Sequence, residues 1–242
     1  MILDLITRAV AEEEAVAEAQ PSWFENAFGD FTEFPWWAWI VLAVLLVGGP
    51  LLYFIIKHFF SKSSKKLVWS TKMLALGAVC MALSNVLSMI KLLSMPQGGS
   101  ITAASMLPLM LFAYVYGVGP GMTVGAVYGV MQYIIDPFFL SVPQVLLDYP
   151  IAFAMVGLAG LFSKSENRTL GLTAGVVLGS FGRFAAAVLS GVVFFADSAG
   201  SQNPWVYSIG YNGAYMLPEC IICVVLALAV GPRLIQQLSK VK

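Results

Sequence analysis

Apolar residues run through most of the chain in long stretches, separated by short segments rich in glycine, proline or charge. A stretch of about 20 apolar residues is long enough to cross the hydrocarbon core of a bilayer as a helix. Helices satisfy their own backbone hydrogen bonds there, which irregular chain does not. The pattern predicts seven spans, at residues 36–56, 69–91, 103–117, 121–135, 143–162, 169–196 and 206–231.

Composition agrees with this interpretation, because 59% of the 242 residues are hydrophobic and only 11% are charged. Soluble domains carry about 25% charged residues. The sequence therefore predicts an all-α polytopic membrane protein.

Positive charges gather at alternate ends of the predicted spans. Ten lysines and arginines fall on one side, many of them in the segment 57–72 and after residue 232, while Arg8 and Lys91 fall on the other. Cytoplasmic loops of membrane proteins carry the excess of basic residues. We therefore expect a multi-pass protein of a bacterial cell membrane, with its N-terminus outside and its C-terminus in the cytoplasm.

The charge pattern also divides the chain into three parts. Eight of the thirteen acidic residues precede the first span, so residues 1–35 are predicted to form an acidic extracellular tail. Residues 36–66 are predicted to be an additional transmembrane helix with a basic cytoplasmic linker. Residues 67–242 are predicted to form a six-helix domain.

Small residues recur at helical spacing in two spans. Gly121, Gly125 and Gly129 follow one another every fourth residue, which allows close contact between helices. Ala75, Ala78 and Ala82 form a similar stripe, and their spacing alone favours ordinary helix packing.

Several kinds of chemistry are excluded or disfavoured. The only histidine, His58, lies among juxtamembrane lysines, which argues against a histidine metal site or a Ser-His-Asp triad. Cys220 and Cys223 have the spacing of a redox or zinc motif, but their apolar setting favours packing. The sequence has no phosphate-binding loop, so any ATP-driven step needs another polypeptide. We expect no cofactor and no enzymatic activity.

Three ionisable residues lie within the predicted spans: Asp148, Arg183 and Glu219. At about 1.5 Å per residue, Arg183 and Glu219 fall at similar depths near the middle of the bilayer. A structural ion pair between them is expected, because each relieves the burial of the other.

Asp148 lies nearer the outer surface, where Lys91 is the only base at a similar depth. Aromatic residues surround that level, and Asn212, Tyr215 and Glu219 share one helical face. A carboxylate among aromatic rings suits a cationic ring system. The alternative is an interfacial aspartate that caps a helix in an aromatic belt.

Several segments together resemble the thiamine-specific S component (ThiT/YuaJ family) of energy-coupling factor transporters. The resemblance covers about residues 70–235 and rests on MPQGGS at 95–100, PQVLLDYPIAF at 143–153, GLAGLF at 157–162, Arg183 with SGVVFF at 190–195, and YSIGYNG at 207–213.

The resemblance implies a six-helix protein that binds thiamine from outside and associates with a transmembrane EcfT-like coupling subunit and two ATPase subunits. It implies the ligand-binding residues Asp148, Tyr149, Tyr207, Asn212, Phe195 and Tyr128. It also implies that Ala75, Ala78 and Ala82 dock the coupling subunit, and that the loop 96–101 closes over the site.

The chain departs from the family pattern at some of these positions. Ala187 stands where members can carry a histidine, and Phe195 and Tyr128 stand where members can carry tryptophan. Two functions of other classes compete with the resemblance. One is a stand-alone secondary transporter that couples protons through Asp148 and Glu219, and the other is an intramembrane lipid-modifying enzyme, which lacks a well-placed nucleophile and base.

Overall fold

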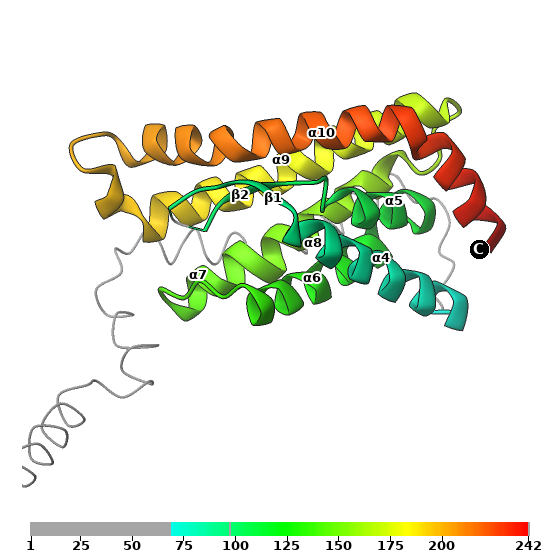
Figure 1. Ribbon diagram of the computed structural model, residues 1–242, viewed down its shortest axis with the longest axis horizontal. Helices are drawn as coiled ribbons and strands as arrows, with labels where there is room; N and C mark the ends of the chain where they lie inside the picture. The colour runs from blue at the N-terminus through cyan, green and yellow to red at the C-terminus, as the bar shows by residue number, and fades with distance from the viewer. Residues whose placement is uncertain (1–68, 97, 242) are drawn as a thin grey trace, which may run out of the picture. The chain divides into compact units, whose positions relative to one another are not determined.

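Six helical segments of ten residues or more follow one another in the computed structural model, which describes residues 69–96 and 98–241 (Figure 1). The predicted acidic tail, the additional span at 36–56 and the basic linker lie outside these residues. The account below concerns the described residues, nearly all of which belong to one compact unit. Their elements are α4 (Thr71–Met89), β1 (Lys91–Ser94), β2 (Ser100–Thr102), α5 (Leu107–Tyr116), α6 (Val118–Ile135), α7 (Val142–Leu146), η2 (Leu147–Ile151), α8 (Ala152–Met155), η3 (Val156–Phe162), α9 (Arg168–Phe194), η4 (Ala196–Ala199) and α10 (Pro204–Val241).

Four helical segments are long and apolar enough to cross a membrane: Thr71–Met89, Val142–Phe162, Arg168–Phe194 and Pro204–Ser239. Together with the shorter apolar α5, they confirm the all-α polytopic class. Two polar side chains mark where spans begin. Ser70 accepts a hydrogen bond from the Met73 amide, and Asn167 accepts one from the Leu170 amide, so each satisfies a free amide of a helix N-terminus.

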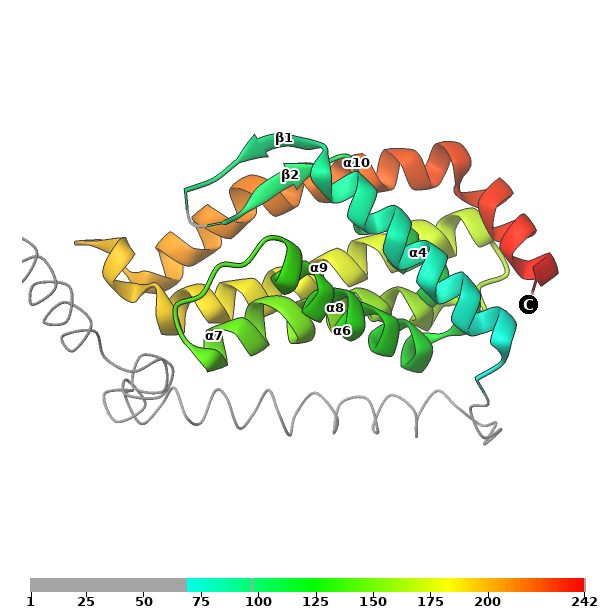
Figure 2. The same ribbon diagram turned by 60° about the horizontal axis from the view of Figure 1, so that its bottom comes forward.

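α5 is the central element of the bundle, and every residue from Leu107 to Val115 is buried. Its ten residues span about 15 Å, roughly half of the hydrocarbon core. A turn at Gly117, with a φ of +96°, leads the chain from α5 into α6. Around this centre, α9 and α10 lie side by side (Figures 1 and 2).

The glycines of α6 let its backbone approach the following span closely. A Cβ atom at Gly125 would lie 2.2 Å from the Phe153 carbonyl oxygen, and one at Gly129 would lie 2.4 Å from the Tyr149 carbonyl oxygen. Any side chain at these positions forces the helices apart. The predicted role of Gly125 and Gly129 in close helix contact is confirmed.

The fourth predicted span, 143–162, is helical but not a regular α-helix. α7 passes into the π-helical turn η2, then into α8 and the 3₁₀-helix η3. Pro150 lies inside η2 and has no amide hydrogen to donate, so the regular hydrogen-bond ladder is interrupted there. π-helical turns of this kind occur frequently at functional sites. Asp148 and Tyr149 lie on this turn.

The segment after α4 differs from its prediction. The sequence predicted a span that ends at residue 91, a loop and a span from residue 103, whereas β1 and β2 form an antiparallel hairpin along α10 (Figure 2). α5 begins only at Leu107, because Pro108 suits the first turn of a helix. α10 also runs ten residues past the predicted end at 231, since it continues through Pro232.

Candidate ligand-binding site

A cavity of about 130 Å³ lies among α6, the segment 142–162, α9, α10 and the hairpin. A site for a single water needs about 10–15 Å³ by the same kind of measure, so this cavity has room for a small molecule. Its lining includes every residue predicted to bind ligand, namely Asp148, Tyr149, Tyr207, Asn212, Phe195 and Tyr128. Residues that lie far apart in the sequence thus meet at one place.

Asp148 supplies a half-buried carboxylate to this cavity. Gln144, one helical turn earlier and 1% exposed, donates a hydrogen bond of 2.6 Å from Nε2 to Asp148 Oδ2. The Ser190 hydroxyl also lies beside this carboxylate. Among the described residues, the single ion pair joins Lys91 to Asp136, so no basic side chain of this part neutralises Asp148 directly. Arg183 lines the same cavity and acts on Asp148 through space, but the direct hydrogen bonds of the carboxylate come from neutral groups, so it can still face a cationic ligand.

Gln144 was not singled out as a site residue from the sequence. The available signal was its spacing, because residues four apart lie on the same face of a helix. A buried amide one turn before a membrane carboxylate is a natural hydrogen-bond partner for it.

Aromatic rings form much of the cavity wall. Tyr128, which is 1% exposed, packs edge-to-face on Phe153 with ring centroids 4.9 Å apart. On α10, Tyr207 and Tyr211 stack with centroids 6.1 Å apart. Such faces attract cations and planar rings.

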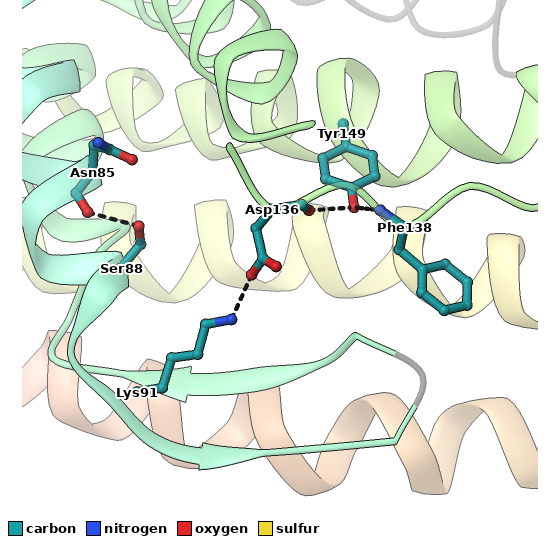
Figure 3. Close-up of polar contacts among 6 residues, drawn as sticks. All are labelled: Asn85, Ser88, Lys91, Asp136, Phe138 and Tyr149. Carbon is teal, nitrogen blue, oxygen red and sulfur yellow. Dashed lines mark hydrogen bonds and ion pairs between the residues drawn. The ribbon is translucent and has the colours of Figure 1, made fainter. Parts of the chain in front are cut away.

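Phe195 closes the cavity at the end of α9. Its ring lies 5.8 Å from that of Phe138, which follows α6. Phe138 lines the cavity too, although it was not among the residues predicted to bind ligand. Nearby, Tyr149 accepts a hydrogen bond from the Phe138 amide (Figure 3).

Asn212 is held by its own protein neighbours. Its Nδ2 donates to the Ala187 carbonyl at 3.3 Å and to the Ser208 carbonyl at 3.0 Å, and its Oδ1 accepts from the Tyr215 hydroxyl at 2.8 Å. These bonds fix the helix pair α9–α10 beside the cavity. A hydrogen bond from Asn212 to ligand stays a prediction, and one of these internal bonds must be shared or exchanged to make it.

Arg183 and Glu219 do not form the predicted ion pair in the part of the chain that the structure describes. The Glu219 carboxylate accepts hydrogen bonds from the Thr102 amide at 2.5 Å and the Thr102 hydroxyl at 2.6 Å. The Arg183 guanidinium lies 4.1 Å from the centroid of the Phe153 ring. Two donors from the hairpin thus compensate for the burial of the carboxylate, and a cation–π contact holds the arginine.

The alanine stripe lies on the outer face of α4. Ala75, Ala78 and Ala82 are all exposed, and the opposite face, which includes Gly77 and Cys80, packs into the bundle. The packing that the spacing alone favoured is therefore not packing against the described residues of this chain. A docking role for the stripe stays a prediction.

Comparison with known proteins decides the family. The model of the family described as "Thiamine transporter protein (Thia_YuaJ)" matches residues 74–238. This chain belongs to that family. The match includes every cavity-lining residue and begins after the predicted tail and additional span.

Individual relatives agree with this assignment. The chain is 37% identical over 188 residues to the thiamine transporter ThiT of Bacillus subtilis, covering 72% of this chain and 96% of the relative. It is 31% identical over 147 residues to ThiT of Lacticaseibacillus paracasei, covering 53% of this chain and 73% of the relative. The family is one of transporters and not of enzymes, which confirms the prediction on activity.

A solved structure of ThiT from Listeria monocytogenes has the same fold. It superposes with a TM-score of 0.59 and 23% identity, covering 67% of this chain and 96% of that chain. The described helices thus have a known fold. The chain is a multi-pass membrane protein and a component of thiamine transport.

Proposed function

We propose that this chain is the substrate-binding membrane subunit of an energy-coupling factor transporter, and that it captures thiamine from outside the cell. One observation supports this above the others: the Asp148 carboxylate lines an aromatic cavity and has no ion-pair partner among the described residues. Thiamine joins a cationic thiazolium ring to an aminopyrimidine ring. A carboxylate supplies charge complementarity to the first, and aromatic faces can stack on both.

Each predicted residue has a proposed role. Asp148 faces the cationic or polar part of the ligand, while Tyr128, Tyr149, Tyr207 and Phe195 pack on its rings. Asn212 exchanges one of its internal hydrogen bonds for a bond to the ligand. The hairpin covers the site, since Gly98, Gly99, Ser100 and Thr102 belong to the cavity wall.

The partners follow from the resemblance and from the exposed face of α4. Ala75, Ala78 and Ala82 are exposed, and so are larger apolar side chains beside them such as Leu74 and Val79, at 56% and 60%. We propose that a transmembrane coupling subunit packs on this face and that two ATPase subunits bind to it in turn. From the positive-inside rule we expect the C-terminus of α10 in the cytoplasm and the hairpin outside.

Proton-coupled transport by the chain alone is the competing function. It needs two carboxylates that can exchange protons along a path. Glu219 lines the cavity with Asp148, but its oxygens already accept hydrogen bonds from Thr102. This arrangement favours a fixed carboxylate over a proton carrier.

Radiolabelled thiamine uptake into proteoliposomes separates the two functions. With the purified chain alone, we expect bound thiamine at the membrane but no accumulation when a proton gradient is imposed. Co-reconstitution with the coupling and ATPase subunits of a family member should give thiamine accumulation. This accumulation should require ATP on the side of the membrane where the ATPase subunits lie. Accumulation by the chain alone that collapses with the gradient would establish the competing function.

A further inference from the structure

Asp136 contacts two different parts of the cavity wall. Its side chain pairs with Lys91 of β1, with Nζ and Oδ2 2.5 Å apart (Figure 3). Its backbone carbonyl accepts a hydrogen bond of 3.0 Å from the Tyr149 hydroxyl. The same residue thus contacts the hairpin on one side and a predicted ligand-binding residue on the other.

The Tyr149 hydroxyl is held from two directions by the short segment 136–138. It donates to the Asp136 carbonyl and accepts from the Phe138 amide at 2.8 Å. Because a phenol has one hydrogen to donate, this arrangement uses its donor and orients the ring. The position of the Tyr149 ring in the cavity therefore depends on where Asp136 and Phe138 lie.

The hairpin is fixed at its base by two contacts of different character. Lys91 and Thr102 are register partners in the hairpin. Thr102 is tied to the buried Glu219 carboxylate, whereas the Lys91 and Asp136 side chains are 39% and 53% exposed. A buried, doubly bonded contact is lost less readily than an exposed ion pair, which water and salt weaken.

The far end of the hairpin lies directly against the cavity. A Cβ atom at Gly99 would meet the Tyr215 ring at 2.6 Å, and Gly98 lies beside the Phe138 ring with a φ of +87°. Displacing the hairpin from α6 therefore uncovers Tyr215 and releases Phe138. Phe138 is the residue whose amide orients Tyr149.

We propose that Asp136 is a positioning residue that couples the hairpin 91–102 to the pocket: its ion pair with Lys91 holds the hairpin over the cavity, and its carbonyl holds Tyr149 against the ligand. The exposed Lys91–Asp136 ion pair is the contact that opens first, and the buried Thr102–Glu219 hydrogen bonds stay formed while the hairpin moves. Loss of the ion pair lets the hairpin swing on Thr102 and loosens Tyr149 in the same movement.

Two variants remove the Lys91–Asp136 ion pair with little change in side-chain volume: Lys91→Met and Asp136→Asn. In each, hydrogen–deuterium exchange of the full chain in detergent should speed up about two- to fivefold in two peptides, one from the hairpin and one containing Tyr149. The matched control is Lys164→Met, which removes an exposed lysine outside the cavity lining. It should leave both peptides unchanged.

The charge-swapped double variant Lys91→Asp with Asp136→Lys should restore slow exchange in both peptides. A role that is merely structural for either side chain does not predict this rescue. High salt should raise the exchange of the wild type towards that of the single variants and leave the variants nearly unchanged. Unchanged exchange in the hairpin of the single variants, or faster exchange in the hairpin without any change around Tyr149, would overturn the coupling.

A second experiment, which rests on the proposed function, measures thiamine dissociation by stopped-flow fluorescence. The single variants should release thiamine about two- to fivefold faster, with association rates nearly unaltered, and the charge swap should reverse the effect. Equal dissociation rates in wild type and variants would contradict the coupling. If the wild type binds no thiamine, the proposed function fails, and the exchange measurements still decide the coupling.

Discussion

Gln144 and Asp148 stand one helical turn apart on the irregular span 142–162, and a hydrogen bond of 2.6 Å joins them inside the cavity. The Gln144 amide donates to Asp148 Oδ2, so it stabilises the charged carboxylate. It also fixes the orientation of the carboxylate, and with it the position of Oδ1. The carboxylate is thereby prepared for a cationic partner before any ligand arrives. This relationship makes Gln144 a test of whether Asp148 must be oriented as well as charged.

Gln144→Leu keeps the volume of the side chain close to that of glutamine and removes its donor. We expect thiamine affinity to fall by about 1 kcal/mol, or roughly fivefold, because one hydrogen bond to a charged group is lost. Isothermal titration calorimetry on the detergent-purified protein measures this. In an Asp148→Asn background the same substitution should have a smaller effect. Equal effects in both backgrounds would show that Gln144 acts independently of Asp148.

The close approach of α6 to the span 142–162 makes its glycines sensitive to a single methyl group. Gly125→Ala and Gly129→Ala each place a Cβ atom within 2.5 Å of a carbonyl oxygen, so we expect each to destabilise the protein by about 1–3 kcal/mol. The melting temperature in detergent reports this.

Gly210→Ala is the matched control, because a Cβ atom there meets nothing within 4 Å and α10 is helical at this position. Alanine favours a helix over glycine by about 1 kcal/mol, so this variant should melt at the same temperature or higher. Equal losses in all three variants would mean that helix contact is not what the α6 glycines provide.

The contacts of Glu219 predict which double-mutant cycle shows coupling. Glu219→Gln and Thr102→Val should couple by about 1 kcal/mol in unfolding experiments, because the Thr102 hydroxyl donates a charge-assisted hydrogen bond to the Glu219 carboxylate, whereas the Thr102 amide remains in both variants. Glu219→Gln and Arg183→Met should couple more weakly, since these side chains make no direct ion pair among the described residues. Stronger coupling to Arg183 than to Thr102 would restore the ion pair that the sequence predicted.

The different outcomes for these residues show what the sequence could and could not provide. Hydropathy locates spans along one dimension, and it predicted the six described spans to within a few residues at most ends. Depth along a helix placed Arg183 and Glu219 at the same level, but it carries no information on the direction in which each side chain points. The actual partner of Glu219 is Thr102, which lies in a hairpin that the sequence did not predict. Strands of three or four residues have too little pattern to be recognised.

The cavity was predicted better than the packing around it. Aromatic and polar residues cluster at one depth around Asp148, and the family motifs name the same residues, so all six predicted ligand contacts line the cavity. The pair Lys91–Asp136 could not be predicted, because it depends on a contact between segments distant in sequence. Pro150 marks an interruption of the span in the sequence, but not that the interruption is a π-helical turn.

The exposed alanine stripe predicts a separation of binding from transport. Ala78→Trp should leave thiamine affinity unchanged, because Ala78 faces away from the cavity, and should lower ATP-dependent uptake at least tenfold by obstructing the coupling subunit. The control is Val177→Trp. Val177 is 48% exposed on α9 and lies outside the proposed docking face of α4. Uptake assays with the full set of subunits compare the two. A normal uptake rate with Ala78→Trp would place the docking surface elsewhere.

The claim that Asp148 is the charge partner of thiamine is tested most directly by isothermal titration calorimetry. Thiamine is titrated into the detergent-purified wild type, Asp148→Asn and Glu166→Gln. Glu166 is exposed and lies outside the cavity lining, so its variant controls for loss of a negative charge alone. The account predicts saturable submicromolar binding by the wild type and by Glu166→Gln. It predicts that Asp148→Asn binds more weakly by about 2 kcal/mol, or roughly thirtyfold. Wild-type affinity in Asp148→Asn would contradict the role of the carboxylate as the charge partner of the ligand.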